Sequence, residues 1–363
     1  MRFNNPWSVG SYYDMHNGNY SGFWYKTNDK IVHRMGHTTG YVKGDEVNDY
    51  FHRAVSFPWE FRNKEPMYWQ GAYGWGCVVF DDGSACFSGQ NDAGHMGWGN
   101  TTASTSWSIS NRWDGSSADR QIKKVMWGGG NSSYTMGIIL AEDGSLWTTG
   151  RSYNGVLGHG NTNAQYSWTQ IQALSNVTID NFWIGGGDAQ WIYAWDDTNG
   201  VMYAWGSNHN GQCGVNNTTG TISTPTQLVN WPTGKTPKSV HLTGWNASDN
   251  SSTSNTSMIL MTDGTVYGCG HNGYHKLSIG NTTQKQTLVQ VGVSGSGIQL
   301  NGSSNSTTVV RMWQFTQTSY AGFLARMKDG STVAWGYNGG MDWMGRGNTS
   351  SDNYPSEVVL ITG

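Results

Sequence analysis

Apolar and polar residues alternate along the chain in short runs, and each pair of runs is joined by a turn dipeptide. The clearest examples read VVFDDGSACFSG, IILAEDGSLWTTG, MILMTDGTVYGCG and FLARMKDGSTVAWG. A period of two predicts half-buried strands, and Asp-Gly between two such runs is a strong short-range signal for a β-hairpin. The dipeptide predicts a two-residue type I′ turn, which needs positive φ at both central positions.

The hairpin pattern occurs six times at regular spacing. YAWDDTNGVMYAWG and FWYKTNDKIVHRMG are the two variant copies, and successive turns are 53 to 66 residues apart. Lys30 holds the second turn position in the first copy, and glycine holds it in the others: Gly83, Gly144, Gly200, Gly264 and Gly330. A regular repeat of this length is typical of radial or stacked architectures.

A second word, Gly-Asn or Asn-Asn, follows each of the last five turns after sixteen or seventeen residues. Its asparagines are Asn100, Asn161, Asn217, Asn281 and Asn348. Glycosylation does not explain the word, because Asn161-Thr162-Asn163 is no acceptor yet keeps its place in the repeat. Glycine tolerates positive φ and asparagine closes an Asx turn, so we predict a corner that ends a strand in each repeat.

Each repeat predicts three to four short strands and no helix. In the third repeat we expect strands at 124–127, 134–140 and 145–149, and in the last repeat a further strand at 356–360. We therefore predict an all-β fold, a β-propeller of six blades that forms one domain over residues 1–363. Seven blades, one of them degenerate, is the alternative.

The order of these words resembles the regulator of chromosome condensation (RCC) family of propellers. The copies DGSLWTTGRSYNGVLGHGNT and NGVMYAWGSNHNGQCGVNNT are similar to the blade core of that family, and the resemblance extends over essentially all 363 residues. The family commonly has seven blades and often carries G-x-x-H-T before the hairpin, whereas no histidine recurs there in this chain. WD and kelch repeats fit less well, because neither of their signatures returns with the period.

Composition and charge narrow the classes of partner. Charged residues make up 12% of the chain, Lys and Arg number only 21, and the formal net charge is −3, so we predict no nucleic-acid partner. The apolar runs are too short to cross a membrane and the N-terminal stretch lacks the apolar core of a secretory signal, so we predict neither membrane insertion nor a signal peptide. The four cysteines predict isolated reduced thiols, since a two-residue turn would place Val79, not Cys77, opposite Cys86.

No set of catalytic or metal-binding residues can be assembled from the sequence. The segment from Gly268 to Gly273 satisfies G-x-G-x-x-G, but no helix is predicted to follow it. His33 and His37, like His271 and His275, are spaced as helical zinc ligands but lie in predicted strand-to-turn segments. We therefore predict no enzymatic activity, no cofactor and no metal.

Side chains beside the corner word differ from repeat to repeat while the word itself is constant. We predict a recognition surface on one propeller face, made of Trp98, Trp107, Tyr153, His159, Trp168, Trp343 and Arg346. The alternative is that some of these aromatic residues fill gaps between blades.

Three functions are compatible with these features. The first is a bacteriophage virion protein of the tail or fibre type, assembled in the host cytoplasm, which binds other virion proteins or a host receptor within a larger assembly. Its support is the Asn/Gly/Ser/Thr/Trp/Tyr composition and the weak charge. The second, implied by the RCC resemblance, is nucleotide exchange on a small GTPase. The third is a lectin-like or inhibitory binding propeller.

Overall fold

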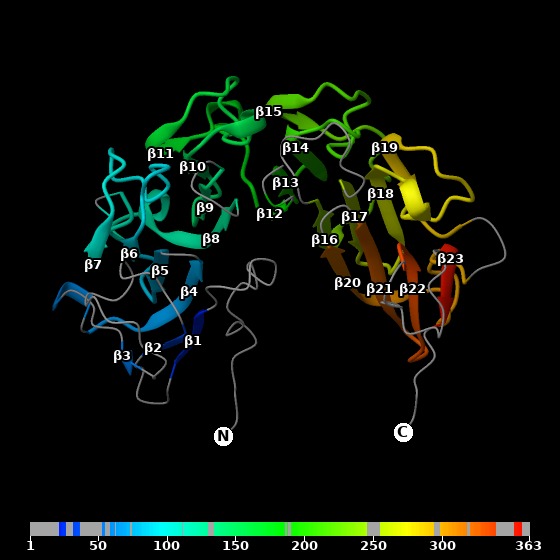
Figure 1. The fold of residues 1–363 in the computed structure, drawn as a ribbon, viewed down its shortest axis with the longest axis horizontal. Coiled ribbons are helices and arrows are strands. Elements are labelled where there is room, and N and C mark those ends of the chain that lie inside the picture. Colours follow the sequence, from blue (N-terminus) through cyan, green and yellow to red (C-terminus); the bar gives the residue numbers. More distant parts are fainter. Residues whose placement is uncertain are drawn as a thin grey trace. The chain divides into compact units, whose positions relative to one another are not determined.

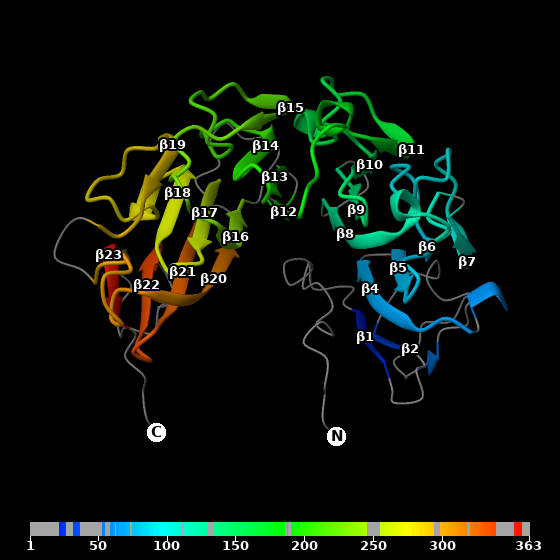
Figure 2. The ribbon, with the colours of Figure 1, turned by 180° about the vertical axis from the view of Figure 1, so that it is seen from behind.

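The computed structural model describes residues 22–26, 32–36, 53–54, 59–61, 63–72, 75–110, 112–129, 134–185, 187, 190–244, 255–293, 298–317, 320–338 and 352–357. These residues form six antiparallel sheets, which can be followed from blue to red in Figures 1 and 2. In the same ranges every helix is a three-residue 3₁₀ turn, and none is long and apolar enough to span a membrane. The predicted all-β class is confirmed.

Each sheet corresponds to one repeat of the sequence, and its strands follow in chain order. The first sheet has three strands, β1 (Gly22–Lys26), β2 (Val32–Gly36) and β3 (Arg53–Ala54). The second has four, β4 (Pro66–Ala72), β5 (Trp75–Phe80), β6 (Ala85–Gly89) and β7 (Ser104–Ile109). The third consists of β8 (Ile122–Gly128), β9 (Met136–Ala141), β10 (Leu146–Gly150) and β11 (Gln165–Gln170).

The remaining three sheets repeat this arrangement. The fourth contains β12 (Asn181–Gly185), β13 (Trp191–Asp196), β14 (Val201–Ser207) and β15 (Thr221–Gln227). The fifth contains β16 (Pro237–Thr243), β17 (Thr256–Met261), β18 (Val266–Gly270) and β19 (Lys285–Gln290). The sixth contains β20 (Val309–Gln317), β21 (Tyr320–Met327), β22 (Thr332–Gly336) and β23 (Asp352–Glu357). The described residues thus contain six blades, and the last strand begins at Asp352, earlier than the predicted 356, while residues 358–360 of that prediction lie outside the described residues.

The hairpin turns differ from the predicted type I′ geometry. Gly83 has φ +75°, but Asp82 does not have positive φ. The amide of Gly83 donates to Phe80 O (2.9 Å) and the amide of Phe80 donates to Ser84 O (2.9 Å), which closes a three-residue loop with glycine in the left-handed position. The turns at Gly144, Gly264 and Gly330 repeat both bonds. The serine or threonine after glycine decides the type, because its amide and hydroxyl both donate to the Asp side chain: 3.0 and 2.5 Å for Ser84 and Asp82.

This three-residue loop changes the strand register by one residue. Val78, not the predicted Val79, lies opposite Cys86, and Cys77 lies opposite Phe87. Since residues directly opposite share a face, the two cysteines lie on opposite faces of their sheet. Both faces are packed, and Cys77 and Cys86 belong to different buried clusters. All four cysteines are free, as predicted, and all four are buried. Burial raises the pKa of the Cys77 thiol, which keeps it protonated.

Contacts divide the chain into two compact units. Residues 1–152 and 163–177 form the first, with three sheets, and residues 153–162 and 178–363 form the second, with the other three. Between sheets two and three of the first unit, Trp75, Phe87, Trp113, Trp127 and Trp168 belong to one buried cluster. In the second unit, sheets four and five share a cluster around Trp191 and Tyr193.

The two ends of each sheet carry different chemistry. Because successive strands are antiparallel, the hairpin turns lie at the same end as the connections into the next sheet, and we call this end the turn side. The corner segments between third and fourth strands lie at the other end, the corner side. Among side chains that the structure describes, Asp92 is the one carboxylate on the corner side.

Candidate binding surface at the blade corners

Three of the described corners are built around a buried asparagine that the sequence prediction left without a role. Asn272 is fully buried; its amide nitrogen donates to Asn281 O (2.7 Å), and its Oδ1 accepts from the amide of Leu277 (2.7 Å). The same two bonds occur at two other corners, which gives three corner asparagines: Asn91, Asn208 and Asn272. Ser152 takes this place in the third repeat. The asparagine side chain thus provides hydrogen-bond partners for backbone amide and carbonyl groups that have no backbone partner in the irregular corner.

The Gly-Asn word has the predicted local geometry. Gly99, Gly160 and Gly280 have φ between +77° and +79°, and Asn216 takes the same conformation at +64°. The side chains of Asn100, Asn217 and Asn281 accept the amide two residues later at 2.8 to 3.0 Å, which is the expected Asx turn. The side-chain amide nitrogen of Asn161 donates to His159 O (3.2 Å). Asn348 lies outside the described residues.

The word also attaches each corner to the outer strand of the following sheet. Gly99 donates its amide to Tyr166 O (2.7 Å), Gly160 donates to Ser223 O (2.8 Å), and Asn216 donates to Gln286 O (2.8 Å). In each case donor and acceptor lie in one unit. Each acceptor lies six or seven residues after the Gly-Asn or Asn-Asn word of the repeat to which it belongs. No feature of the sequence indicates that it bonds to the word of the preceding repeat.

A second bond joins consecutive repeats deeper in the corner. The indole of Trp205 donates to Val156 O (2.7 Å), and the indole of Trp335 donates to Lys276 O (2.8 Å). Thr149 and Cys269 occupy the same strand position and donate to Gly94 O (3.0 Å) and Gln212 O (3.5 Å). The position thus carries tryptophan, threonine or cysteine as donor, and the acceptor of Thr149 lies one residue earlier in its corner than the acceptors of the other three.

These backbone bonds bring two unlike residues near each other at three corners. One precedes the Gly-Asn word and the other belongs to the acceptor residue of the next outer strand. In the first unit the pair is Trp98 with Tyr166, and in the second unit the pairs are His159 with Ser223 and Val215 with Gln286. We call these six residues, taken within their own unit, the corner surface. Tyr166 is 39% exposed, and its ring lies against Gly94, where an added Cβ would be 2.2 Å from Cδ1.

The structure divides the residues predicted to bind. Trp98 and His159 are half-buried members of the corner surface, and burial lowers the pKa of His159. Tyr153, six residues before His159, is 39% exposed. Trp168 is buried: its ring fills the space between sheets two and three, against Gly97 and Gly137. Trp107 packs on the cluster of Phe61, Val78, Phe80 and Cys86. Trp343 and Arg346 lie outside the described residues. Sequence reasoning missed Tyr166, Ser223 and Gln286, the other half of each pair.

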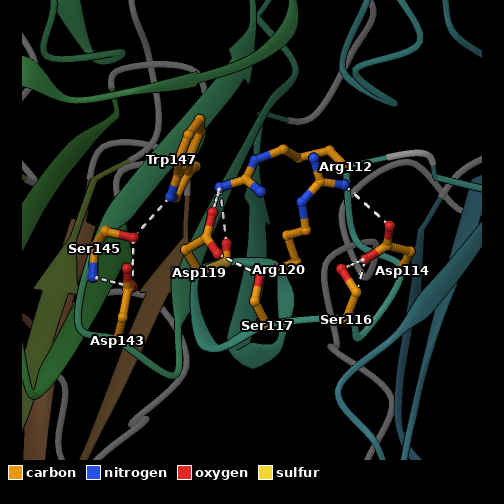
Figure 3. Close-up of polar contacts among 9 residues, drawn as sticks. All are labelled: Arg112, Asp114, Ser116, Ser117, Asp119, Arg120, Asp143, Ser145 and Trp147. Carbon is orange, nitrogen blue, oxygen red and sulfur yellow. Dashed lines mark hydrogen bonds and ion pairs between the residues drawn. The ribbon is translucent and has the colours of Figure 1, made fainter.

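Four ion pairs lie on the turn side of the described sheets. Figure 3 shows Arg112 beside Asp119 and Arg120 beside Asp114, both ion pairs of 3.0 Å. The guanidinium carbon of Arg112 is also 3.9 Å from the ring centroid of Trp147. Hydrogen bonds from Ser117 and Arg112 lower the pKa of Asp119, despite an opposing contribution from burial. This network stabilises the connection between β7 and β8 and leaves few charges for an incoming ligand.

Two lysines make an equivalent contact in different repeats. Lys64 and Lys235 each lie two residues before the proline that begins the first strand of a sheet. Lys64 is 2.7 Å from Asp82 and donates to Ser84, while Lys235 is bonded to Asp263 and Thr265. These pairs hold the connection against the hairpin turn, so we assign them a structural role. The described residues contain no group of three or more His, Cys, Asp or Glu side chains that could hold a metal ion.

Known proteins with a similar repeat match parts of this chain. The model of the regulator of chromosome condensation (RCC1) repeat matches residues 199–244. Mouse protein RCC2 is 33% identical over 92 residues, which are 25% of this chain and 17% of that protein. The human E3 ubiquitin-protein ligase HERC2 is 26% identical over 142 residues, 39% of this chain and 2% of that protein. The chain thus spans less than a fifth of these relatives.

Solved structures match over most of the chain. Human WBSCR16 has a TM-score of 0.65 at 17% identity, covering 94% of this chain and 80% of that one. Yeast RCC1 (Prp20), solved with Kap60, has a TM-score of 0.61 at 13% identity, covering 94% and 74%. The fold is an RCC1-like β-propeller.

Proposed function

We propose that this protein is a non-enzymatic binding propeller whose corner surface recognises a protein partner. The observation that carries the proposal is the contrast at the corners: one backbone bond is repeated three times, and each copy holds a different pair of side chains. A repeated backbone arrangement that carries different side chains can recognise a specific partner and needs no catalytic residues. Fold alone does not assign this role, since one fold serves many functions.

The chemistry of the corner side suits a protein partner. Trp98 and Tyr166 belong to one corner through the bond from the Gly99 amide to Tyr166 O, and Trp and Tyr are enriched among the residues that dominate protein interfaces. Asp92 is the one carboxylate among the described side chains of this side, so recognition there rests on aromatic and uncharged polar contacts. On the turn side, several lysine and arginine side chains are instead engaged in ion pairs within the chain.

A small GTPase is the partner class that the relatives favour. The structure of Prp20p from Saccharomyces cerevisiae, similar with a TM-score of 0.60 at 14% identity, was reported together with its binding to Gsp1p and histones. For this chain we propose the GTPase partner on the shared fold, and nucleotide exchange as its consequence. A panel of small GTPases loaded with fluorescent GDP tests it: faster nucleotide release supports exchange, and an unchanged rate across the panel refutes it.

The virion role has only compositional support. None of the similar proteins named above is a virion protein, so a tail or fibre protein is the less favoured proposal. It predicts that mass spectrometry of purified particles detects the chain. The lectin-like role predicts glycan binding that depends on Trp98.

Binding through the corner surface is tested by affinity purification with three variants. Tyr166→Ala and Trp98→Ala each remove one member of the aromatic pair, whereas Glu142→Ala changes an exposed residue of the turn side. We expect one protein to be retained by the wild type and by Glu142→Ala but lost with both corner variants. Retention by the corner variants, with loss in Glu142→Ala, would show that the turn side binds instead.

A further inference from the structure

The corner between β18 and β19 differs in its backbone from the other described corners. Tyr274, His275 and Ser278 all have positive φ, at +59°, +55° and +49°. This left-handed conformation is unfavourable for residues that carry a Cβ, and asparagine is among the few that adopt it readily. Six described residues other than glycine have positive φ, and the three outside this corner are all asparagine: Asn154, Asn216 and Asn230.

The other corners have glycine at the position of His275, three residues after the corner asparagine or Ser152. The equivalent residues, with φ between +70° and +75°, are Gly94, Gly155 and Gly211. At Gly94 an added Cβ would lie 2.2 Å from Tyr166 Cδ1, so glycine there allows the following outer strand to approach closely. Because His275 carries a side chain at this place, β23 cannot approach the fifth corner as closely.

The strained backbone of this corner holds two partly exposed rings. Tyr274 and His275 are both half-buried. The ring of Tyr274 lies edge-on to that of Tyr337, with 4.9 Å between the two centroids. Nδ1 of His275 is buried and makes no hydrogen bond within the described residues. Ser278 differs from both, since its side chain is fully buried and belongs to the interior.

The third repeat shows that this backbone can form without either ring. Asn154 and Gly155 take the places of Tyr274 and His275 there, with φ of +52° and +70°. Asparagine and glycine are the residues that adopt the left-handed conformation with least strain. A strained pair at a place where a relaxed pair forms the same turn indicates a role other than folding, because backbone strain is concentrated at functional sites.

We propose that Tyr274 and His275 are specificity-determining residues of the corner side in the second unit, where their rings contact the protein partner directly. The inference rests on the proposed function, since it assigns both rings to the same partner. The corner segments of this unit, residues 153–162, 207–220 and 270–284, contain no carboxylate. A partner surface that presents apolar side chains and hydrogen-bond acceptors fits two such rings.

A double variant that carries Tyr274→Asn and His275→Gly installs the residue pair of the third repeat and tests this assignment. The probe is the protein that the wild type retains in affinity purification, titrated by calorimetry after it has been identified and purified. We expect the double variant to bind it at least about ten-fold more weakly, because it lacks both contacting rings. We expect its melting temperature to rise, or to fall by no more than about 3 °C, since the substitutions relieve backbone strain.

Two results of this titration overturn the proposal. An affinity loss of less than about ten-fold would show that the rings do not contact the partner. A melting temperature lowered by more than about 3 °C would show that they stabilise the corner instead. Ser278→Gly is the matched control, because it relaxes a third left-handed residue of the same corner and leaves both rings in place. It should bind as the wild type does, and an equal loss of affinity would assign the effect to the backbone and overturn the proposal.

Tyr166→Ala separates this inference from the proposed function. Weak binding by Tyr166→Ala and by the double variant supports both. Weak binding by Tyr166→Ala with full binding by the double variant refutes the role of Tyr274 and His275 and leaves the proposed function standing. Full binding by both variants, or a wild type that retains no protein, refutes the proposed function and this inference together.

Discussion

Replacing a corner asparagine tests whether these buried side chains hold the corners together. Asn272→Ala removes the bonds to Asn281 O (2.7 Å) and Thr283 O (3.2 Å) and the bond accepted from the amide of Leu277 (2.7 Å). The two carbonyls belong to exposed residues and can bind water. Leu277 is fully buried, so its amide is left without a partner.

The magnitude follows from this difference. An unsatisfied buried donor costs about 1–3 kcal/mol, and each hydrogen bond replaced by water costs roughly 1 kcal/mol or less. We therefore expect Asn272→Ala to lower the free energy of unfolding by about 2–4 kcal/mol. Asn281→Ala, at an exposed position of the same corner, removes one Asx bond of 2.9 Å and should cost about 1 kcal/mol or less.

Urea denaturation measures both variants, and hydrogen exchange of the Leu277 amide reports whether the loss is local. We expect Asn272→Ala to accelerate exchange at Leu277 and Asn281→Ala to leave it nearly unchanged. Asn272→Ser should fall between wild type and Asn272→Ala, since the third repeat carries serine at this place. A loss in Asn272→Ala no greater than in Asn281→Ala would refute the reasoning.

Three further predictions concern turns, buried histidines and the bonds between repeats. Gly264→Ala should lower the free energy of unfolding by about 2–3 kcal/mol, because φ is +83° and an added Cβ would lie 2.4 Å from Thr308. Gly200→Ala should lower it by about 1 kcal/mol, because φ is +65° but nothing lies within 4 Å of an added Cβ. Equal melting temperatures of the two variants would contradict this reasoning. Burial lowers the pKa of His95 to about 3 and that of His241 to about 4. Below pH ~6.5 the unfolded chain therefore binds more protons than the folded chain. As the pH is lowered through this range, the free energy of unfolding should fall by up to about 1.4 kcal/mol per pH unit for each histidine. His95→Gln should reduce that slope in urea titrations, and an unchanged slope would exclude the contribution. Trp205→Phe leaves a buried carbonyl without its donor and should cost about 1–3 kcal/mol by thermal unfolding, and no loss would show that this bond does not stabilise the protein.

The repeat made the fold accessible from sequence. Alternation and spacing identified the central hairpin of each blade and the position of every described corner. The predicted type I′ turn was wrong because the prediction considered only the Asp-Gly dipeptide and not the residue after it. The hydroxyl and amide of Ser84 both donate to Asp82, and these bonds favour the three-residue loop. One residue of loop length then shifted the register between β5 and β6.

The candidate surface was only half predictable. The residue before the Gly-Asn word could be read from its variation, which gave Trp98 and His159. Tyr166 and Ser223 could not be assigned, because a backbone bond between different repeats brings them to the corner. Trp168 was predicted to face a partner but belongs to the buried cluster between sheets two and three. Its neighbours in the sequence do not show whether a tryptophan fills the space between sheets or faces solvent.

Site-specific photo-crosslinking tests the central claim, that the corner surface binds a protein partner, most directly. A benzophenone amino acid is placed at Tyr166, and a matched one at Glu142 on the turn side, and the cross-linked products are identified by mass spectrometry. We predict one protein cross-linked from position 166 and absent from position 142, with the cross-link lost when Trp98 is also changed to Ala. The same protein cross-linked from position 142 and not from 166 would contradict the account.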